Sequence, residues 1–151
     1  MIAVIQRVTS AKVVVNSAVV GECQRGFAIL LGVAKGDGLE DADLLAAKIS
    51  KLRVFEDENG KMNKALDDVS GSCVVVSQFT LMADYSHGNR PSFFDAAPPD
   101  IAEPTYEYFC QKLKSLISGD VQTGIFGADM KYEIHNDGPV TIIMDSLKLR
   151  K

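Results

Sequence analysis

The chain has 151 residues and a formal net charge of −4. A chain of this length fits one domain that buries roughly 68–70% of its unfolded surface, so residues 1–151 are predicted to form a single domain. The acidic balance argues against a protein that coats DNA or RNA, because neutralising phosphates requires clustered Lys and Arg. A nucleic-acid ligand would have to be held locally.

The cysteines and the apolar runs indicate the cellular compartment. Cys23, Cys73 and Cys110 are far apart and contain no CxxC pair, so neither a disulfide framework nor a zinc site is indicated. The longest apolar run, 27–33, is too short to cross a bilayer, and residues 1–8 lack the basic start of a signal peptide. We expect a cytoplasmic protein with reduced thiols, no membrane partner and no metal.

In chain order, the first part of the sequence predicts an antiparallel β-meander. Short runs rich in β-branched or apolar residues are separated by turn residues such as Asn16-Ser17 and Arg25-Gly26. After residue 38 the apolar period becomes helical and predicts an amphipathic helix over 40–55, with acidic residues at its N-terminal end. The predicted strands are residues 2–7, 12–15, 18–23 and 27–34.

The central stretch, residues 72–84, predicts a buried strand that ends in polar residues. A continuous apolar run from Cys73 to Val76 is typical of a strand covered on both faces. With the strand period of two, Gln78 and Thr80 then emerge on one face. Read alone, this pair either lines the wall of a site or makes ordinary hydrogen bonds beside the sheet.

Residues 85–99 predict a long loop that carries His87, Arg90 and Phe93. Loops held by a scaffold often supply binding groups. The equally acceptable alternative is structural, with Arg90 paired to a carboxylate and Phe93-Phe94 filling a small satellite core.

A second amphipathic helix is predicted from about residue 101 to 117, and three strands follow it at 121–126, 131–135 and 140–144. Between the last two strands, Asn136-Asp137-Gly138-Pro139 reads as a hairpin turn. Its composition alone favours a trans Gly–Pro bond, because only about 5–6% of X–Pro bonds in folded proteins are cis.

Two motifs together make a family resemblance specific. The run Ser77-Gln78-Phe79-Thr80 on a strand, with NDGPVT at 136–141, closely resembles the D-aminoacyl-tRNA deacylase family, of the D-tyrosyl-tRNA deacylase type. The departures are Asn89, where many members have a basic residue, and Lys64, where a small or apolar residue is frequent. Both bear on loop contacts to tRNA. Agreement covers almost the whole chain and includes residues 1–8, 60–63, 90–93 and 126–130.

The resemblance implies a fold and an activity. The fold is an α/β, three-layer β/β/α sandwich with largely antiparallel strands and two main helices, in a cytosolic homodimer. The activity is hydrolysis of the ester that joins a D-amino acid, or glycine, to the 3′ end of tRNA. The resemblance also implies that Gly138-Pro139 is a cis peptide whose carbonyl oxygens enter the other subunit's active site and exclude L-substrates.

Carried over by position, the resemblance implies roles for individual residues. Phe79, Phe126 and Met130 would hold the terminal adenosine, with Ser77 and Gln78 close to it. Stacking on aromatic and thioether groups grips an RNA end without a basic surface. The catalytic residues would be Gln78, Phe79 and Thr80, with an oxyanion hole formed by backbone N–H groups around Phe79 and Thr80.

The residue that activates the attacking water is harder to assign. His87 and His135 are the only histidines, and a Thr80 nucleophile would need an adjacent base that the motif does not supply. We favour assistance by the substrate's own ribose 2′-OH, with no cofactor. Two alternatives from other classes stay open: a non-catalytic module that binds adenylate ends or D-amino acids, and a Thr80-dependent hydrolase of small esters.

Overall fold

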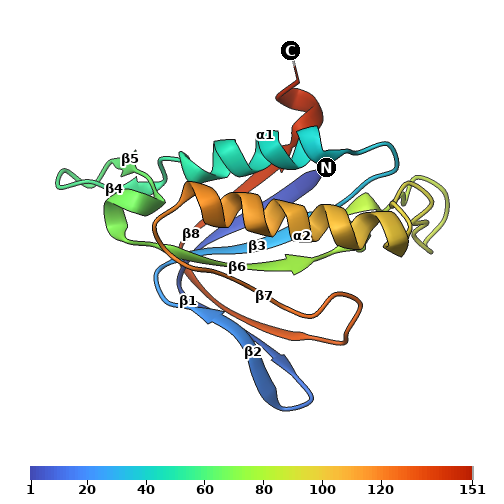
Figure 1. Ribbon diagram of the computed structural model, residues 1–151, viewed down its shortest axis with the longest axis horizontal. Coiled ribbons are helices and arrows are strands. Elements are labelled where there is room, and N and C mark those ends of the chain that lie inside the picture. The colour runs from blue at the N-terminus through green and yellow to red at the C-terminus, as the bar shows by residue number, and fades with distance from the viewer. Residues whose placement is uncertain (151) are drawn as a thin grey trace.

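A six-stranded sheet covered on one face by two helices organises residues 1–150, the part of the chain that the computed structural model describes (Figure 1). Neither helix is long and apolar enough to cross a membrane within these residues. In chain order the elements are β1 (Ile2–Val15), β2 (Ala18–Cys23), β3 (Gly26–Gly32), α1 (Leu39–Ser50), β4 (Phe55–Glu56), β5 (Met62–Lys64), η1 (Leu66–Val69), β6 (Ser72–Ser77), η2 (Phe79–Met82), α2 (Pro99–Leu116), β7 (Val121–Thr123), β8 (Lys131–Asp145) and η3 (Ser146–Lys148), where η marks a 3₁₀ turn.

The sheet is mixed, which the predicted meander describes only in part. Strand β1 pairs antiparallel with β2, β3 and β8. The predicted meander includes the pairing with β2, but it does not include the pairing with β8, and it places residues 18–23, not β1, beside β3. Strand β6, however, pairs parallel with β3 and with β7. The chain reaches β6 and β7 through crossovers that contain α1 and α2, and a crossover of this kind places neighbouring strands parallel. The mixed α/β class and the two helices are confirmed.

Two long strands correct the predicted boundaries. Residues 2–7 and 12–15 belong to one strand, β1, and residues 131–135 and 140–144 belong to one strand, β8. Strand β8 runs antiparallel along β1 from the pair Ile2↔Asp145 to the pair Val14↔Lys131. The prediction of a hairpin turn at residues 136–139 is therefore wrong.

The polar residues within β8 form a bulge instead of a reversal. The register pairs Gln6 with Thr141 and Val8 with Asn136, which leaves residues 137–140 opposite Arg7. A bulge places extra residues on one strand and redirects the chain locally without ending the pairing. The Gly138–Pro139 bond in this bulge is cis, as the resemblance implies and against the expectation from composition.

The sheet separates two hydrophobic clusters. The larger lies between the sheet and the helices and includes Ile29 and Phe109, while the smaller lies on the other face and includes Val13 and Val76. The smaller cluster forms because the second half of β1 curls back over the sheet with β2 and β8. The end of β6 thus has apolar side chains on both faces.

The curl brings two of the edge strands, β2 and β7, together. The backbone N–H of Glu22 donates to Oε1 of Gln122 at 2.8 Å. A Cβ atom on Gly21 would lie 2.3 Å from the carbonyl oxygen of Thr123, so this contact requires glycine.

We therefore expect Gly21→Ala to lower the free energy of unfolding by about 1–3 kcal/mol, the usual cost of overpacking. The comparison variant is Gly38→Ala, because a Cβ on Gly38 meets nothing within 4 Å; since Gly38 is the N-cap of α1, this variant should lose only about 0.5 kcal/mol. Urea unfolding of both variants measures the difference. Equal midpoints would contradict a close approach of β2 to β7.

Candidate active site

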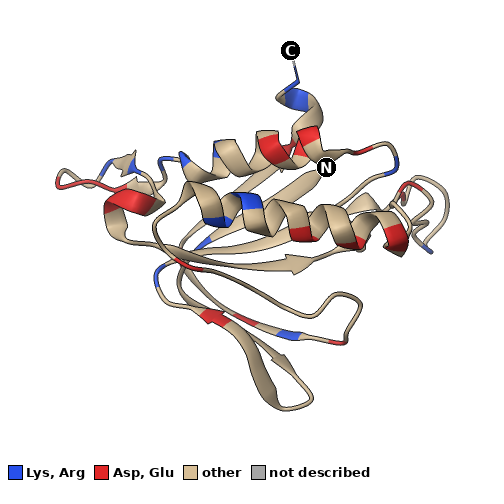
Figure 2. Ribbon diagram, viewed as in Figure 1, with Lys and Arg blue, Asp and Glu red and all other residues tan. Residues whose placement is uncertain are grey.

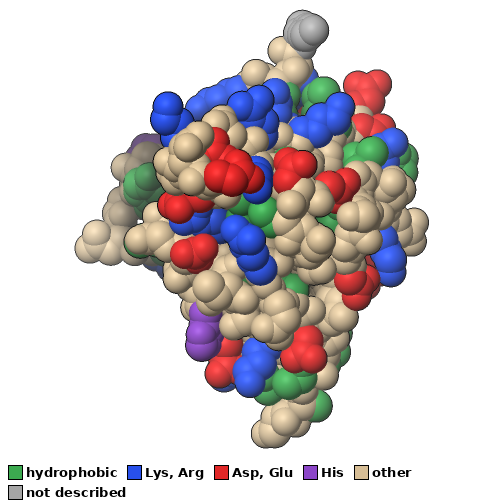
Figure 3. All heavy atoms as spheres, turned by 90° about the vertical axis from the view of Figure 1, so that its left-hand side faces the viewer, with side chains coloured by type: hydrophobic (Ala, Val, Ile, Leu, Met, Phe, Trp, Pro, Cys, Tyr) green, Lys and Arg blue, Asp and Glu red, His purple; other side chains and the backbone are tan. Residues whose placement is uncertain are grey.

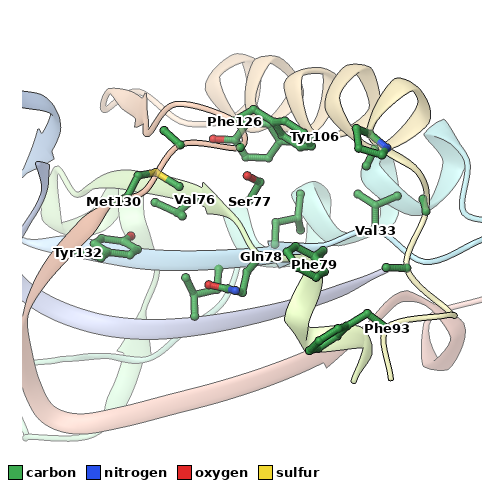
Figure 4. A pocket seen from close by; sticks show the side chains of 18 of the residues that line it. Val33, Val76, Ser77, Gln78, Phe79, Phe93, Tyr106, Phe126, Met130 and Tyr132 are labelled. Atoms are coloured by element: carbon green, nitrogen blue, oxygen red, sulfur yellow. The ribbon is translucent and has the colours of Figure 1, made fainter. Parts of the chain in front are cut away.

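A cavity of about 740 Å³ lies at the C-terminal end of β6, where the strand passes into η2 (Figure 4). Val76, Ser77 and Gln78 form its floor at the strand end. Side chains from the 93–102 segment, from α2 and from the 126–134 segment form its walls. Because alternate residues of a strand point to opposite faces, the cavity extends around the strand end to both sides of the sheet.

Aromatic pairs build the walls. Phe79 and Phe93 meet edge to face with ring centroids 5.1 Å apart, and Tyr106 and Phe126 lie 6.1 Å apart. Figure 4 shows the Tyr106–Phe126 pair on the helix side of the strand end and Met130 near Val76. Phe79 is 57% exposed, so the cavity has an open apolar rim.

The structure brings most of the sequence-predicted site residues together. Ser77, Gln78, Phe79, Phe126 and Met130 all line the cavity. Thr80 lies at its edge, where the Nε2 of Gln78 donates a hydrogen bond to the Thr80 hydroxyl. Gly138 and Pro139 do not line this cavity, and both are exposed on the bulge of β8. The chemical roles of these eight residues stay predictions.

The η2 turn is held firmly against β3. The backbone N–H of Gln78 donates to the carbonyl oxygen of Leu31 at 2.8 Å. Gly32 lets the turn approach, because a Cβ there would lie 2.9 Å from the carbonyl oxygen of Gln78. As the first residues of a helical turn, Phe79 and Thr80 have backbone N–H groups without an acceptor inside the turn. These two donors are available to a ligand at the cavity edge.

Two tyrosines support the strand end, and sequence reasoning missed their role. The hydroxyl of Tyr106 donates to the carbonyl oxygen of Val75 at 2.7 Å, and that of Tyr132 donates to Val74 at 2.8 Å. Burial raises the pKa of both phenols, so they remain neutral donors. The available signal was that buried tyrosines usually have a hydrogen-bond partner. The partner itself could not be read from the sequence.

The cavity offers little that could act as a base. Its titratable side chains are Tyr106, Tyr132 and Asp129, and the Asp129 side chain is 90% exposed and 3.6 Å from Lys131 Nζ. The thiols are not activated either, because burial raises the pKa of Cys23 to about 11. Within residues 1–150, no group of His, Cys, Asp or Glu side chains could hold a metal ion.

The two histidines lie outside the cavity. His87 is in the exposed 84–95 loop, where the Ser86 hydroxyl donates to Asp84 at 2.6 Å and lies 2.9 Å from His87 Nδ1. In a catalytic triad the histidine stands between the serine and the acid, whereas here the serine does. His135 is exposed on β8, opposite Ser10.

The two aromatic residues and the arginine of this loop can now be compared with the two interpretations of the loop. Phe93 lines the cavity against Phe79, so it is part of the candidate site. Phe94 is 75% exposed with Lys35 Nζ 3.4 Å from its ring centroid, so the expected satellite core is wrong for this residue. Arg90 is exposed and forms no ion pair with any of residues 1–150, which contradicts the structural alternative for it.

Comparisons with known proteins show the family of the chain. The family model described as D-Tyr-tRNA(Tyr) deacylase matches residues 4–145. A D-aminoacyl-tRNA deacylase of Anaeromyxobacter dehalogenans is 54% identical over 149 residues, 99% of each chain. One of Fervidobacterium nodosum is 49% identical with the same coverage. The chain therefore belongs to the D-Tyr-tRNA(Tyr) deacylase family, and the predicted resemblance is confirmed.

Two solved structures share the fold. One, titled c-Myc DNA Unwinding Element Binding Protein, has 40% identity and a TM-score of 0.90 and covers 96% of this chain and 98% of its own. The other, titled a probable eukaryotic D-amino acid tRNA deacylase, has 15% identity and a TM-score of 0.78, with 95% and 97% covered. At that identity the second structure supports the fold alone.

Proposed function

We propose that this chain is an aminoacyl-tRNA editing hydrolase that cleaves the ester of D-aminoacyl-tRNA, and of mischarged glycyl-tRNA, and spares L-aminoacyl-tRNA. The observation that carries the proposal is that a chain in this family gathers Ser77, Gln78, Phe79, Phe126 and Met130 around one apolar cavity. Its volume of about 740 Å³ lies within the usual range for a small-molecule site, so a terminal nucleoside with its aminoacyl group can enter.

The walls suit a nucleoside, and the rim suits the ester. Phe126 and Met130 offer an aromatic and a thioether surface for the adenine ring, and Phe79 offers a second ring at the mouth. The N–H groups of Phe79 and Thr80 then stabilise the negative charge that develops on the ester carbonyl oxygen when water adds to the carbonyl carbon. Each such donor typically contributes roughly 2.7–4 kcal/mol to lowering the barrier.

The proton of the attacking water goes to the substrate in this proposal. The group hydrogen-bonded to the Thr80 hydroxyl is the Gln78 amide, which cannot accept a proton as a base does. This supports substrate-assisted hydrolysis over a Thr80 nucleophile. In the proposed step the ribose 2′-OH beside the ester accepts the proton of the water as the new C–O bond forms, and it passes its own proton to the 3′-oxygen as the ester bond breaks.

Rejection of L-substrates is proposed to come from a second copy of the chain in a homodimer. Gly138 and Pro139 are exposed and lie outside their own cavity, so they are free to enter a partner's site. Backbone carbonyls there would strike an L-substituent and leave D-substituents and glycine untouched. The three-layer β/β/α arrangement and a cytoplasmic location belong to the same proposal, and the hydrophobic clusters on both faces of the sheet support the first.

One tRNA charged in turn with D-, L- and glycyl groups tests the function. We expect release of the D- and glycyl groups and retention of the L-group. Binding of all three without release would favour the non-catalytic module. Cleavage of simple esters that lack a 2′-OH would favour the small-ester hydrolase.

In the proposed substrate-assisted mechanism, Thr80 contributes only its backbone N–H. We therefore expect Thr80→Val, which keeps that group, to deacylate the D-substrate within about tenfold of the rate of the unchanged chain. Single-turnover hydrolysis measures this without interference from product release. Loss of a true nucleophile would lower the rate by roughly 10⁴-fold or more. A fall of that size would remove the substrate-assisted mechanism.

A further inference from the structure

Exposed cations gather at the C-terminal end of α1 and at the β4–β5 hairpin that follows it. They are Lys48, Lys51, Arg53 and Lys61, and all four are exposed; we call them the α1–hairpin cations. Blue segments of the ribbon mark this end of α1 and the hairpin in Figure 2. Figure 3 looks directly at this end, and blue side chains gather along its upper edge.

Two of the three acidic side chains in the hairpin have partners within it. Asp57 accepts hydrogen bonds from the backbone N–H groups of Asn59 and Lys61, at 2.8 and 3.0 Å, and from Asn63 Nδ2 at 2.8 Å. Glu58 pairs with Lys64 at 2.8 Å. Glu56 is the other acid of the hairpin and is exposed.

The α1–hairpin cations themselves form no ion pair with any of residues 1–150. Arg53 donates to the side-chain oxygen of Asn63 at 2.9 Å, which is a neutral partner. The surface therefore carries unpaired positive charge on a chain whose net charge is −4. A local surface of this kind suits a ligand with several closely spaced negative charges, such as the phosphates of a nucleic acid strand.

One buried side chain ties this surface to the Gly138–Pro139 bulge. Nη1 of Arg7 donates to the carbonyl oxygen of Val54 at 2.7 Å, and its Nε donates to that of Asp137 at 3.1 Å. Val54 directly follows Arg53, and Asp137 directly precedes Gly138. The base of the hairpin and the bulge are thus neighbours on the surface.

The cavity of the same chain lies at the other end of α1. The loop before α1 pairs with the cavity wall through the bridge Ala34↔Ala96. The 12 residues of α1 then span about 18 Å before reaching Lys51. The α1–hairpin cations are therefore closer to their own bulge than to their own cavity.

We propose that the α1–hairpin cations of one subunit bind acceptor-strand phosphates of the tRNA whose aminoacylated end lies in the partner subunit's cavity. This rests on the proposed function, in which the bulge faces the ester in the partner's cavity. The nucleotides that precede the terminal adenosine then leave the cavity beside the hairpin of the subunit that supplies the bulge. The cations bind the phosphates of the acceptor strand, while the cavity binds the aminoacylated adenosine.

The first test separates the strand from its end. Lys51→Glu/Lys61→Glu is compared with a control that changes the same charge elsewhere, Lys12→Glu/Lys148→Glu. Each protein is assayed on D-aminoacyl-tRNA and on adenosine carrying the same D-aminoacyl ester at its 3′ position.

We expect the α1–hairpin variant to lose about tenfold or more in kcat/KM on the tRNA, with a slope against log salt shallower by about 0.7 for each phosphate of the single strand that the variant no longer neutralises. On the adenosine ester it should match the unchanged chain, and the control should match on both substrates. An undiminished rate on the tRNA, or an equal loss on both substrates, would overturn the inference. An unchanged chain that cleaves neither substrate would overturn the proposed function and this inference with it.

The second test asks which subunit's cations serve which cavity. It uses purified heterodimers in which one subunit keeps the α1–hairpin cations and the other carries Lys51→Glu/Lys61→Glu. In each heterodimer, Ala96→Trp fills the cavity of one of the two subunits. When the filled cavity is on the subunit with intact cations, the open cavity faces those cations, and we expect on the order of half the rate of the unchanged dimer, one open site of two. When the filled cavity is on the subunit with Lys51→Glu/Lys61→Glu, the open cavity faces the substituted surface. Its rate should then equal the rate for each cavity of a dimer in which both subunits carry Lys51→Glu/Lys61→Glu. The reverse order, or equal rates, would overturn binding across the subunits.

Discussion

Replacing Arg7 with methionine is expected to lower the free energy of unfolding by about 3 kcal/mol and to reduce D-aminoacyl-tRNA deacylation by about 100-fold. Arg7 is 6% exposed, and its guanidinium donates to the carbonyl oxygens of Val54 and Asp137. Methionine fills much of the space but leaves both oxygens without their charged donor. The loss of activity follows because the bulge that carries Gly138 is no longer fixed to the body of the fold.

Two further substitutions separate these effects. Lysine at position 7 keeps the charge but has one compact ammonium group, which cannot satisfy both carbonyls as a planar guanidinium does, so we expect only partial recovery. Arg25→Met is the control, because Arg25 is exposed and lies over the Phe55 ring, 5.4 Å from the centroid. It should cost about 0.5–1 kcal/mol and leave the rate unchanged. Urea unfolding and single-turnover hydrolysis give the two readouts; full activity of Arg7→Met would exclude a role for the bulge in the reaction.

The second large effect is expected on the substrate side. A tRNA that ends in 2′-deoxyadenosine and is charged with a D-amino acid at the 3′ position should bind normally but react about 10²–10⁴-fold more slowly, the usual contribution of a positioned proton-transfer group. The cavity supports this expectation, because its two phenols already donate to Val74 and Val75 and its third titratable group, Asp129, is largely in solvent.

The comparison uses the same tRNA with a ribose at its end, with binding measured by competition and hydrolysis under single-turnover conditions. A deoxy substrate that reacts as fast as the ribo substrate would remove the 2′-OH from the mechanism. It would also return Thr80 to consideration as a nucleophile in a small-ester hydrolase.

The sequence predicted best where the pattern is local. The apolar run Cys73–Val76 forms a buried strand, and the polar residues at its end do emerge at a cavity. The helical spacing over residues 40–55 and 101–117 located both helices, although α1 ends at Ser50 because Lys51 already leaves helical geometry. Such patterns depend on which face of a single element is buried, and one segment is enough to show this.

The sequence predicted least well where pairing decides the structure. Residues 136–139 have the composition of a turn, and a bulge uses the same residue types, so only the continuous pairing with β1 distinguishes them. The parallel pairing of β6 likewise depends on crossovers, not on β6 itself. The tyrosine contacts to Val74 and Val75 join residues far apart in the chain, which no local pattern reveals.

The length of β8 has a consequence for newly made chains. Its 15 residues pair with β1 on one side, and no other strand among residues 1–150 pairs with it. Ile143, 71% exposed, adds an apolar side chain to this strand. A long open strand edge can pair with strands of other molecules, so single subunits at high concentration are prone to aggregate. In the proposed homodimer, rapid association with a second copy would leave that edge open only briefly, so assembly would protect the chain as well as complete its site.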